Sequence, residues 1–273
     1  MSPVDRRAFS TLGCPGADIE EVIRLAATGG RCEGVELRCA PGQLVEPGTS
    51  AEEARVLARR LAVAGVEVVC LASYVQVAST APGVVDDLRN HLRLAARLGA
   101  ARLRVFGGGA EQPKGGRERA VRNLASAAPV AEAAGVTIVL ETHDEFLSGQ
   151  AVADILAAVG SRAVGAVWDA VNPWRAGEPV GRTAQLLAPW LRHVQLKDVA
   201  SATELSPVLP GHGVLPLHEV LRELAGIGYR GWISLEWERA WFPHAAPLPQ
   251  ALAAFHRVLD ASPHSTGPAS DRR

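Results

Sequence analysis

Four oxygen-donating side chains stand at the ends of successive apolar runs in the second half of the chain. They are Glu141, Asp169, Gln195 and Glu236. Three carboxylates brought together would repel one another and lose hydration, and a divalent cation would relieve both costs. Carboxylate and amide oxygens suit Mn²⁺, Mg²⁺ or Co²⁺ better than a metal that prefers thiolates. The pattern therefore predicts a site for one divalent metal ion, with Mn²⁺ as the first candidate.

A purely structural interpretation of these residues is the alternative. An acid at the end of a strand is usually a helix cap or one half of an ion pair, and any one of the four alone would be interpreted that way. Four donors on adjacent strands favour the metal. Without a metal, Arg38, Arg104 or Lys197 would be the cations that neutralise the acids.

Two further polar side chains follow these donors at a spacing of two residues. Strand side chains alternate between faces, so His143 shares a face with Glu141, and Lys197 should also face the site. His143 is a candidate general acid for a departing hydroxyl or glycoside, with an exposed loop histidine as the alternative. Lys197 is a candidate to polarise a substrate oxygen, or else to pair with Asp198 or Glu236.

Arg104 precedes the run Gly107-Gly108-Gly109 and is a candidate to bind an anionic or polyhydroxyl group of a substrate. The glycines lack the lysine of a phosphate-binding P-loop, so a flexible turn is the favoured interpretation. His193 lies deeper along its strand than the oxygen donors, which predicts a hydrogen-bonded core histidine.

The elements that must position these residues alternate between short β-branched runs and amphipathic Ala/Leu/Arg-rich stretches. Strands are predicted at 8–12, 34–38, 67–72, 102–106, 137–143, 164–169, 192–197 and 232–236. Helices are predicted at 18–28, 50–64, 84–98, 116–134, 149–159, 181–187 and 217–226. Such alternation gives parallel strands with right-handed crossovers, and eight repeats favour a closed (β/α)₈ TIM barrel. We expect a single α/β domain over 1–261 and a disordered tail over 262–273.

Composition narrows the class of protein. The chain has 273 residues, a formal net charge of −1 and 48% hydrophobic residues. This near-neutral balance gives no basic footprint for nucleic acid or for an anionic membrane surface. No apolar run reaches the roughly 18 residues of a membrane span, and the first residues do not form a signal peptide. The four cysteines show no C-x-x-C spacing, so we expect reduced thiols and a cytoplasmic protein.

From about residue 9 to residue 259, the chain resembles the xylose isomerase-like TIM barrel superfamily, and within it the sugar phosphate isomerase/epimerase-like proteins. The specific motifs are Leu140-Glu141-Thr142-His143, Trp168-Asp169, Gln195-Leu196-Lys197-Asp198 and Ser234-Leu235-Glu236-Trp237-Glu238. The resemblance implies one divalent metal bound by Glu141, Asp169, Gln195 and Glu236. It also implies that Glu141 and Glu236 act as acid/base groups, and that Glu36, in the looser motif Gly34-Val35-Glu36-Leu37-Arg38, belongs to the substrate site.

Two residues depart from the pattern of this superfamily. Its third ligand is usually His, where this chain has Gln195, although the 3-dehydroshikimate dehydratases of the superfamily also have Gln. Asn172 stands where relatives often have a His that contacts substrate oxygens. The resemblance therefore implies a substrate contact for Asn172 without a titrating side chain.

The chemistry that the resemblance implies is proton abstraction next to a carbonyl. The metal would act as a Lewis acid, and a carboxylate would remove the α proton to give an enediolate. The leading hypothesis is an isomerase or epimerase of a small sugar or keto-sugar. A metal-dependent lyase or dehydratase acting on a cyclic keto-acid or a 3-oxo-glycoside is the second, and a metal-free, non-catalytic barrel is another alternative.

A DNA-repair endonuclease, also found in this superfamily, is disfavoured because the chain lacks the additional His ligands and a basic face. The expected partner is a small carbohydrate-like molecule rather than nucleic acid or a membrane. Relatives often form dimers or tetramers, so a homo-oligomer is possible. The apolar segment Trp241-Phe242-Pro243 is a candidate interface or lid.

Overall fold

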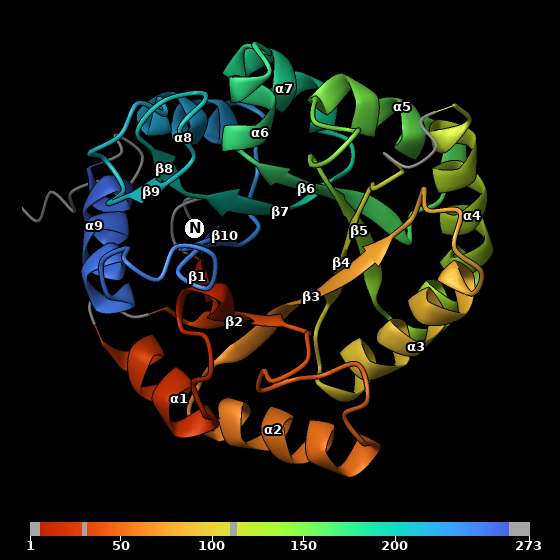
Figure 1. Ribbon diagram of the computed structural model, residues 1–273, viewed down its shortest axis with the longest axis horizontal. Helices are drawn as coiled ribbons and strands as arrows, with labels where there is room; N and C mark the ends of the chain where they lie inside the picture. Colours follow the sequence, from red (N-terminus) through yellow and green to blue (C-terminus); the bar gives the residue numbers. More distant parts are fainter. Residues whose placement is uncertain (1–5, 29–31, 110–113, 262–273) are drawn as a thin grey trace, which may run out of the picture.

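In the computed structural model, which describes residues 6–28, 32–109 and 114–261, eight parallel strands form a closed barrel inside a ring of helices (Figure 1). The strands run in the order β1-β10-β7-β6-β5-β4-β3-β2 around the barrel. Their bounds are β1 Arg7–Ser10, β2 Gly34–Arg38, β3 Glu67–Gln76, β4 Arg102–Phe106, β5 Thr137–Glu141, β6 Val164–Asp169, β7 Leu191–Leu196 and β10 Ile233–Leu235. The predicted (β/α)₈ barrel is confirmed. The tail predicted over 262–273 lies outside the described residues.

The helices that cover the barrel are α1 Ile19–Ala27, α2 Ala51–Val63, α3 Val84–Arg97, α4 Gly116–Ala134, α5 Gly149–Val159, α6 Val171–Arg175, α7 Val180–Leu187, α8 Leu217–Gly226 and α9 Leu248–Asp260. Three of them begin at a side chain that caps free backbone N–H groups, namely Asp18, Ser50 and Ser148. The Glu53 carboxylate accepts the backbone N–H of Ser50, which completes a capping box. None of the described helices is long and apolar enough to cross a membrane.

Most differences between the predicted and observed elements lie at strand ends. β1 stops at Ser10 because its side chain caps a 3₁₀ turn, η1, over Thr11–Gly13. β3 continues to Gln76, which pairs with Phe106 of β4. β5 stops at Glu141, shortly before a tight turn. The elements without a predicted counterpart are α6, α9 and the short antiparallel pair of β8, Asp198–Val199, with β9, Pro207–Val208.

The barrel interior changes from apolar to polar along its axis. A small apolar cluster inside the barrel comprises Ala8, Val69, Cys70, Val139, Val167 and Trp232. Val139 and Val167 lie two residues before Glu141 and Asp169 on the same strands, and therefore on the same inward face. The carboxylates consequently form the next layer toward the C-terminal ends, which is where barrels place their active sites.

The loop after β7 is organised by a single buried carboxylate. Asp198 accepts hydrogen bonds from the backbone N–H groups of Val199, Gly211, Gly213 and Leu215, at 2.9 to 3.1 Å. Asp198 therefore binds its own loop and does not pair with Lys197, which corrects one of the two partners expected for that lysine.

Candidate functional site

Three carboxylates meet at the C-terminal mouth of the barrel. Glu141 ends β5, Asp169 ends β6, and Glu236 directly follows β10. One oxygen of each lies within 4.8 Å of the other two, and the three side chains are almost completely buried. The structure thus brings together the three acids that the sequence analysis singled out as metal ligands.

Lys197 lies among these acids. Its Nζ is 2.9 Å from Asp169 Oδ2, 2.7 Å from Glu236 Oε2 and 2.6 Å from Glu238 Oε1. The expected pairing with Glu236 is therefore present, and Glu238 is an additional acid at the site. Together these three acids raise the pKa of Lys197 well above its ordinary value despite its burial, so the side chain is an ammonium ion.

Arg104, on β4, is the second cation of the site. Its Nε lies 3.2 Å from Glu141 Oε2, but the two atoms are not aligned for a hydrogen bond. The guanidinium donates from Nη1 to the carbonyl oxygen of Ser73 at 2.8 Å and packs over the ring of Phe106 at 3.9 Å. Arg104 is thereby held in the wall of the site.

The charges of this cluster are not balanced. When all are ionised, four carboxylates (Glu141, Asp169, Glu236 and Glu238) face two cations, Lys197 and Arg104, which leaves two negative charges in a buried region. Two positive charges are what one divalent cation supplies.

Glu141 and Glu236 differ in their pKa because their surroundings in this cluster differ. Burial raises the pKa of Glu141 to about 8, with Arg104 opposing the shift and Glu236 adding to it. Burial would also raise the pKa of Glu236, but the charge and hydrogen bond of Lys197 hold it below the ordinary value. Burial raises the pKa of Asp169, against the attraction of Lys197. In the metal-free protein, Glu141 therefore holds a proton near neutral pH while Glu236 is ionised.

Gln195 lies beside the acids, since its Cα pairs with that of Asp169 across β6 and β7. Its Nε2 donates to Glu36 Oε1 at 2.8 Å, and His193 Nε2 donates to Glu36 Oε2 at 2.7 Å. All three side chains are fully buried. His193 is therefore the hydrogen-bonded core histidine that was expected. The structure does not bring Glu36, expected in the substrate site, into the cavity.

Asn172, the second residue of α6, contacts a carboxylate of the cluster. Its Nδ2 donates to Asp169 Oδ2 at 2.7 Å, and its Oδ1 accepts from Arg175 Nε at 3.1 Å. The backbone N–H of Val171 donates to Asp169 Oδ1 at 3.0 Å. Asn172 thus fixes the orientation of Asp169, and it is not among the residues that line the cavity.

His143 is oriented by Asp144, a residue that the sequence analysis did not single out. His143 Nδ1 lies 2.6 Å from Asp144 Oδ1, and Asp144 Oδ2 accepts the backbone N–H of Gly108 at 3.0 Å. The ring stacks against Phe106, with centroids 4.5 Å apart. Burial alone would lower the pKa of His143, but the hydrogen bond to Asp144 and the charge of Glu141 raise it. With Nδ1 engaged, Nε2 is the ring nitrogen left to exchange a proton.

Asp144 has a φ of 51°, the only positive value at a non-glycine among the described residues. Such a conformation is strained for most side chains and is most accessible to Asn and Asp. The turn is held in place by the hydrogen bonds of Asp144 to Gly108 and His143. A non-glycine residue in this conformation gives no distinct sequence signal, which explains why Asp144 was missed.

A cavity of about 320 Å³ opens above the cluster. Its walls include Tyr74, Phe106, His143 and Trp241, and its floor includes Glu141, Lys197 and Glu236. At its rim, the Arg38 guanidinium lies between the rings of Tyr74 and Trp241, at 5.3 and 4.7 Å, and its Nε donates to the Tyr74 hydroxyl at 2.7 Å. The cavity therefore combines charged groups at the bottom with aromatic surfaces at the entrance.

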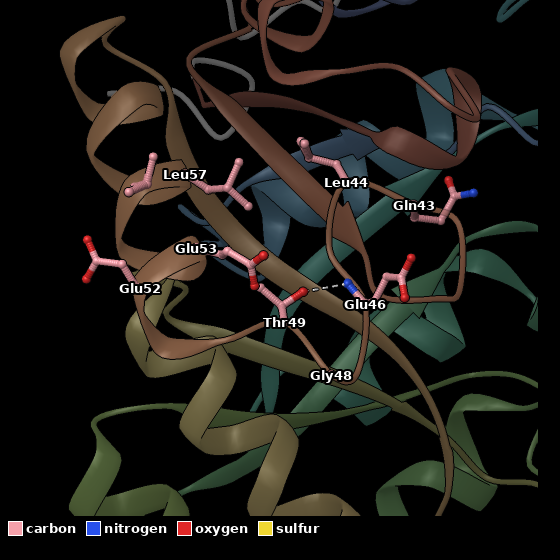
Figure 2. Close-up of a pocket in the computed structure, with 9 residues that line it drawn as sticks. Gln43, Leu44, Glu46, Gly48, Thr49, Glu52, Glu53 and Leu57 are labelled. Atoms are coloured by element: carbon pink, nitrogen blue, oxygen red, sulfur yellow. Dashed lines mark hydrogen bonds between the residues drawn. The ribbon is translucent and has the colours of Figure 1, made fainter.

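A larger groove of about 580 Å³ lies elsewhere, between the β2–α2 loop and α2 (Figure 2). Its acidic residues are engaged in local structure. Glu46 accepts from the backbone N–H of Gly42 and donates its own N–H to Thr49 Oγ1, while Glu53 caps α2. This groove therefore contains no convergent set of reactive groups.

The donors at the mouth fit a divalent cation. Gln195 Oε1 and Glu141 Oε2 are buried and receive no hydrogen bond from the described part of the chain. Unsatisfied buried acceptors are costly, and a cation of the Mn²⁺ or Mg²⁺ type is coordinated by this kind of oxygen. Lys197 is the one feature that opposes the fit, because its ammonium group contacts two of the same carboxylates.

Comparison with known proteins identifies the family. Residues 23–258 match the family described as xylose isomerase-like TIM barrel. The chain belongs to this family, in agreement with the resemblance drawn from its strand-end motifs.

Individual relatives give a more detailed comparison. Fructoselysine 3-epimerase from Escherichia coli O157:H7 is 29% identical over 123 residues, which are 43% of this chain and 44% of that protein. The match therefore spans less than half of the relative's length. Among solved structures, the probable 3-DHS dehydratase AsbF from Bacillus anthracis gives a TM-score of 0.76 at 19% identity, covering 93% of this chain and 98% of that one. The IOLI protein, solved with a binding zinc atom, gives 0.79 at 17% identity, with the same coverage.

Proposed function

We propose that this protein is a divalent-metal-dependent isomerase or epimerase of a small sugar or keto-sugar. The observation that carries the proposal is the buried cluster of Glu141, Asp169 and Glu236 at the mouth of a barrel of this family, where burying three acids so close together is costly without a cation. The sugar epimerase among the matched relatives supports the substrate class. Mn²⁺ is our first candidate for the ion, with Mg²⁺ and Co²⁺ as alternatives, and one structural neighbour was solved with a binding zinc atom.

In this proposal, the two glutamates divide the proton transfer. A bound divalent cation would polarise a substrate carbonyl and its neighbouring hydroxyl and so lower the cost of an enediolate. Glu236, which Lys197 keeps ionised, removes the proton α to the carbonyl. Glu141, the second glutamate of the cluster, returns a proton to the opposite face or to the neighbouring carbon. Arg104 and Lys197 bind substrate oxygens.

A metal-dependent dehydratase or lyase, with a cyclic keto-acid or 3-oxo-glycoside as substrate, is a second candidate because of one observation. His143 is held by Asp144 against Phe106 on the cavity wall, which is the arrangement of a general acid that protonates a departing group. The dehydratase among the structural neighbours is consistent with this branch. Detection of eliminated water or aglycone, with no epimer formed, would select it.

Metal analysis is the experiment that tests the proposal. We expect protein purified without chelator to contain close to one equivalent of Mn, Mg or Co by mass spectrometry. Glu141→Gln and Glu236→Gln should lose that metal, because each removes a charged ligand. Glu132→Gln, on the exposed face of α4, is the matched control and should retain it.

A metal-free barrel predicts a different outcome. If the wild-type protein contains no metal even after reconstitution, Lys197 and Arg104 serve as the counter-charges of the acids, and the metalloenzyme proposal is wrong.

We further propose a reducing, cytoplasmic setting, in line with four free cysteines. Formation of a homo-oligomer stays a prediction, which size-exclusion chromatography with light scattering would test.

A further inference from the structure

The buried pair of Glu36 and Gln195 contributes to the site without contacting the cavity. The two residues belong to β2 and β7, which are not adjacent in the barrel, so their hydrogen bond crosses its interior. Glu36 accepts from Gln195 Nε2 at 2.8 Å and from His193 Nε2 at 2.7 Å. None of the three side chains has measurable solvent exposure.

The chemistry of a carboxylate determines which end of the amide faces it. An ionised carboxylate only accepts hydrogen bonds, so the end of the Gln195 amide next to Glu36 must be the NH₂ group. The carbonyl oxygen is then turned away from Glu36. That atom, Gln195 Oε1, is buried and accepts no hydrogen bond within the described ranges.

We propose that Glu36 is a positioning residue that presents the carbonyl oxygen of Gln195, rather than its NH₂ group, to the divalent cation of the proposed metalloenzyme. The inference rests on the metal site proposed above. A glutamine amide is ambiguous as a ligand, since its NH₂ end repels a cation and its oxygen binds one. Glu36 removes this ambiguity and is itself held by His193, so the amide cannot rotate without losing a charge-assisted hydrogen bond.

A double-mutant cycle on Mn²⁺ affinity tests this role, with the dissociation constant measured by isothermal titration calorimetry on wild type, Glu36→Gln, Gln195→Ala and the double variant. We expect Glu36→Gln to weaken Mn²⁺ binding about 10- to 100-fold, as loss of an outer-shell partner does. In the Gln195→Ala background, the same substitution should weaken binding less than about threefold, because no amide is left to orient.

Ser234→Ala is the matched control in the same buried layer. The Cα of Ser234 pairs with that of Gln195 across β10 and β7, and its Oγ makes no hydrogen bond within the described ranges, so Mn²⁺ affinity should stay within about threefold of wild type. Thermal unfolding of every variant reports on folding. If Glu36→Gln does not fold, Glu36→Asp replaces it in the cycle. Its side chain is shorter by one methylene, so the acceptor is withdrawn from Gln195 and Mn²⁺ binding should again weaken.

The outcomes separate this inference from the proposed function. If wild type binds Mn²⁺ and Glu36→Gln binds it equally well, or loses the same factor with and without Gln195, the positioning role is wrong while the metalloenzyme stands. If wild type binds none of Mn²⁺, Mg²⁺ and Co²⁺, both are overturned.

Discussion

The two ends of the barrel use buried polar groups in opposite ways. At the mouth, four carboxylates share two cations, and Glu141 Oε2 accepts no hydrogen bond from the residues that the structure describes. At the base, Arg7 bonds both His256 and Asp260, while Tyr229 donates to the backbone of Trp232 at 2.8 Å. The unsatisfied groups at the mouth therefore lower the free energy of unfolding, and a bound ligand can offset that loss. The paired groups at the opposite end of the barrel raise it. In such barrels, the two roles commonly divide between the two faces.

A substitution at the mouth should have the largest effect, and on activity rather than stability. We expect Glu236→Gln to reduce turnover about 1000-fold, because the ionised base is lost. The melting temperature should change by only a few degrees. Exchange of the α proton of keto-sugars in D₂O, followed by NMR, measures the effect. Full exchange in this variant would contradict the assignment of Glu236 as the base.

A substitution at the opposite end of the barrel, where the strands begin, should have the next largest effect, and on stability alone. A Cβ at Gly34 would lie 2.5 Å from Val69 Cγ1 and 2.8 Å from Trp232 Cζ3. We therefore expect Gly34→Ala to lower the free energy of unfolding by about 2 to 3 kcal/mol, measured by urea denaturation. Gly48→Ala, where the added Cβ meets no atom within 4 Å, is the control. Equal stability of the two variants would refute close packing at this end.

The turn at Asp144 should have an intermediate effect on catalysis. Asp144→Asn keeps an acceptor for Gly108 but presents an N–H group to His143, which disfavours the tautomer with its proton on Nδ1. If His143 transfers a proton, kcat should fall about 10- to 100-fold with little change in KM. Steady-state kinetics beside Glu145→Gln, an exposed neighbour, would check this. An unchanged kcat would assign His143 to a structural role.

The smallest effect is the contribution of His256, near the start of the strands, to the pH dependence of the free energy of unfolding. Burial, and next to it the charge of Arg7, lower the pKa of His256 from 6.5 to about 4. Between these values the unfolded chain binds the additional proton, so stability is complete above about pH 6.5 and falls as the pH drops toward 4. After allowance for solvent screening, we expect a loss of about 1 to 2 kcal/mol.

His256→Gln should remove this contribution to the pH dependence. Urea unfolding at several pH values between 7.5 and 4.5 would compare the variant with the wild type, since the titration of all other groups is common to both. Parallel curves for the two proteins would mean that His256 does not titrate as inferred.

Much of the fold could be predicted because it rests on local patterns. β2, β4 and β6 and the helices α4, α5 and α8 match the predicted ranges, since each combines a clear hydrophobic period with a glycine or a cap at its ends. The three carboxylates were found by the same logic, as the last inward residues of strands. The helix Leu248–Asp260 was missed, although a proline precedes it and Pro249 lies in its first turn, which is a usual helix start.

The contacts within the site were harder to predict. Alternation places Glu36 and Gln195 on inward faces but does not decide between the cavity and a partner across the barrel, and 159 residues separate the two. The partners of Lys197 depend in the same way on the three-dimensional arrangement of several acids. The turn at Asp144 depends on hydrogen bonds to Gly108 and His143, which only the folded chain provides.

Asp198 gives the loop after β7 a particular evolutionary freedom. Its carboxylate joins Val199 at the start of the loop to Gly211, Gly213 and Leu215 at the end, so both ends are fixed at one point directly next to Lys197. The entropy of closing a loop rises only slowly with its length. Residues 200–210 can therefore be lengthened, shortened or exchanged while Lys197 keeps its place, so this segment can vary in evolution without disturbing the charged cluster at the mouth.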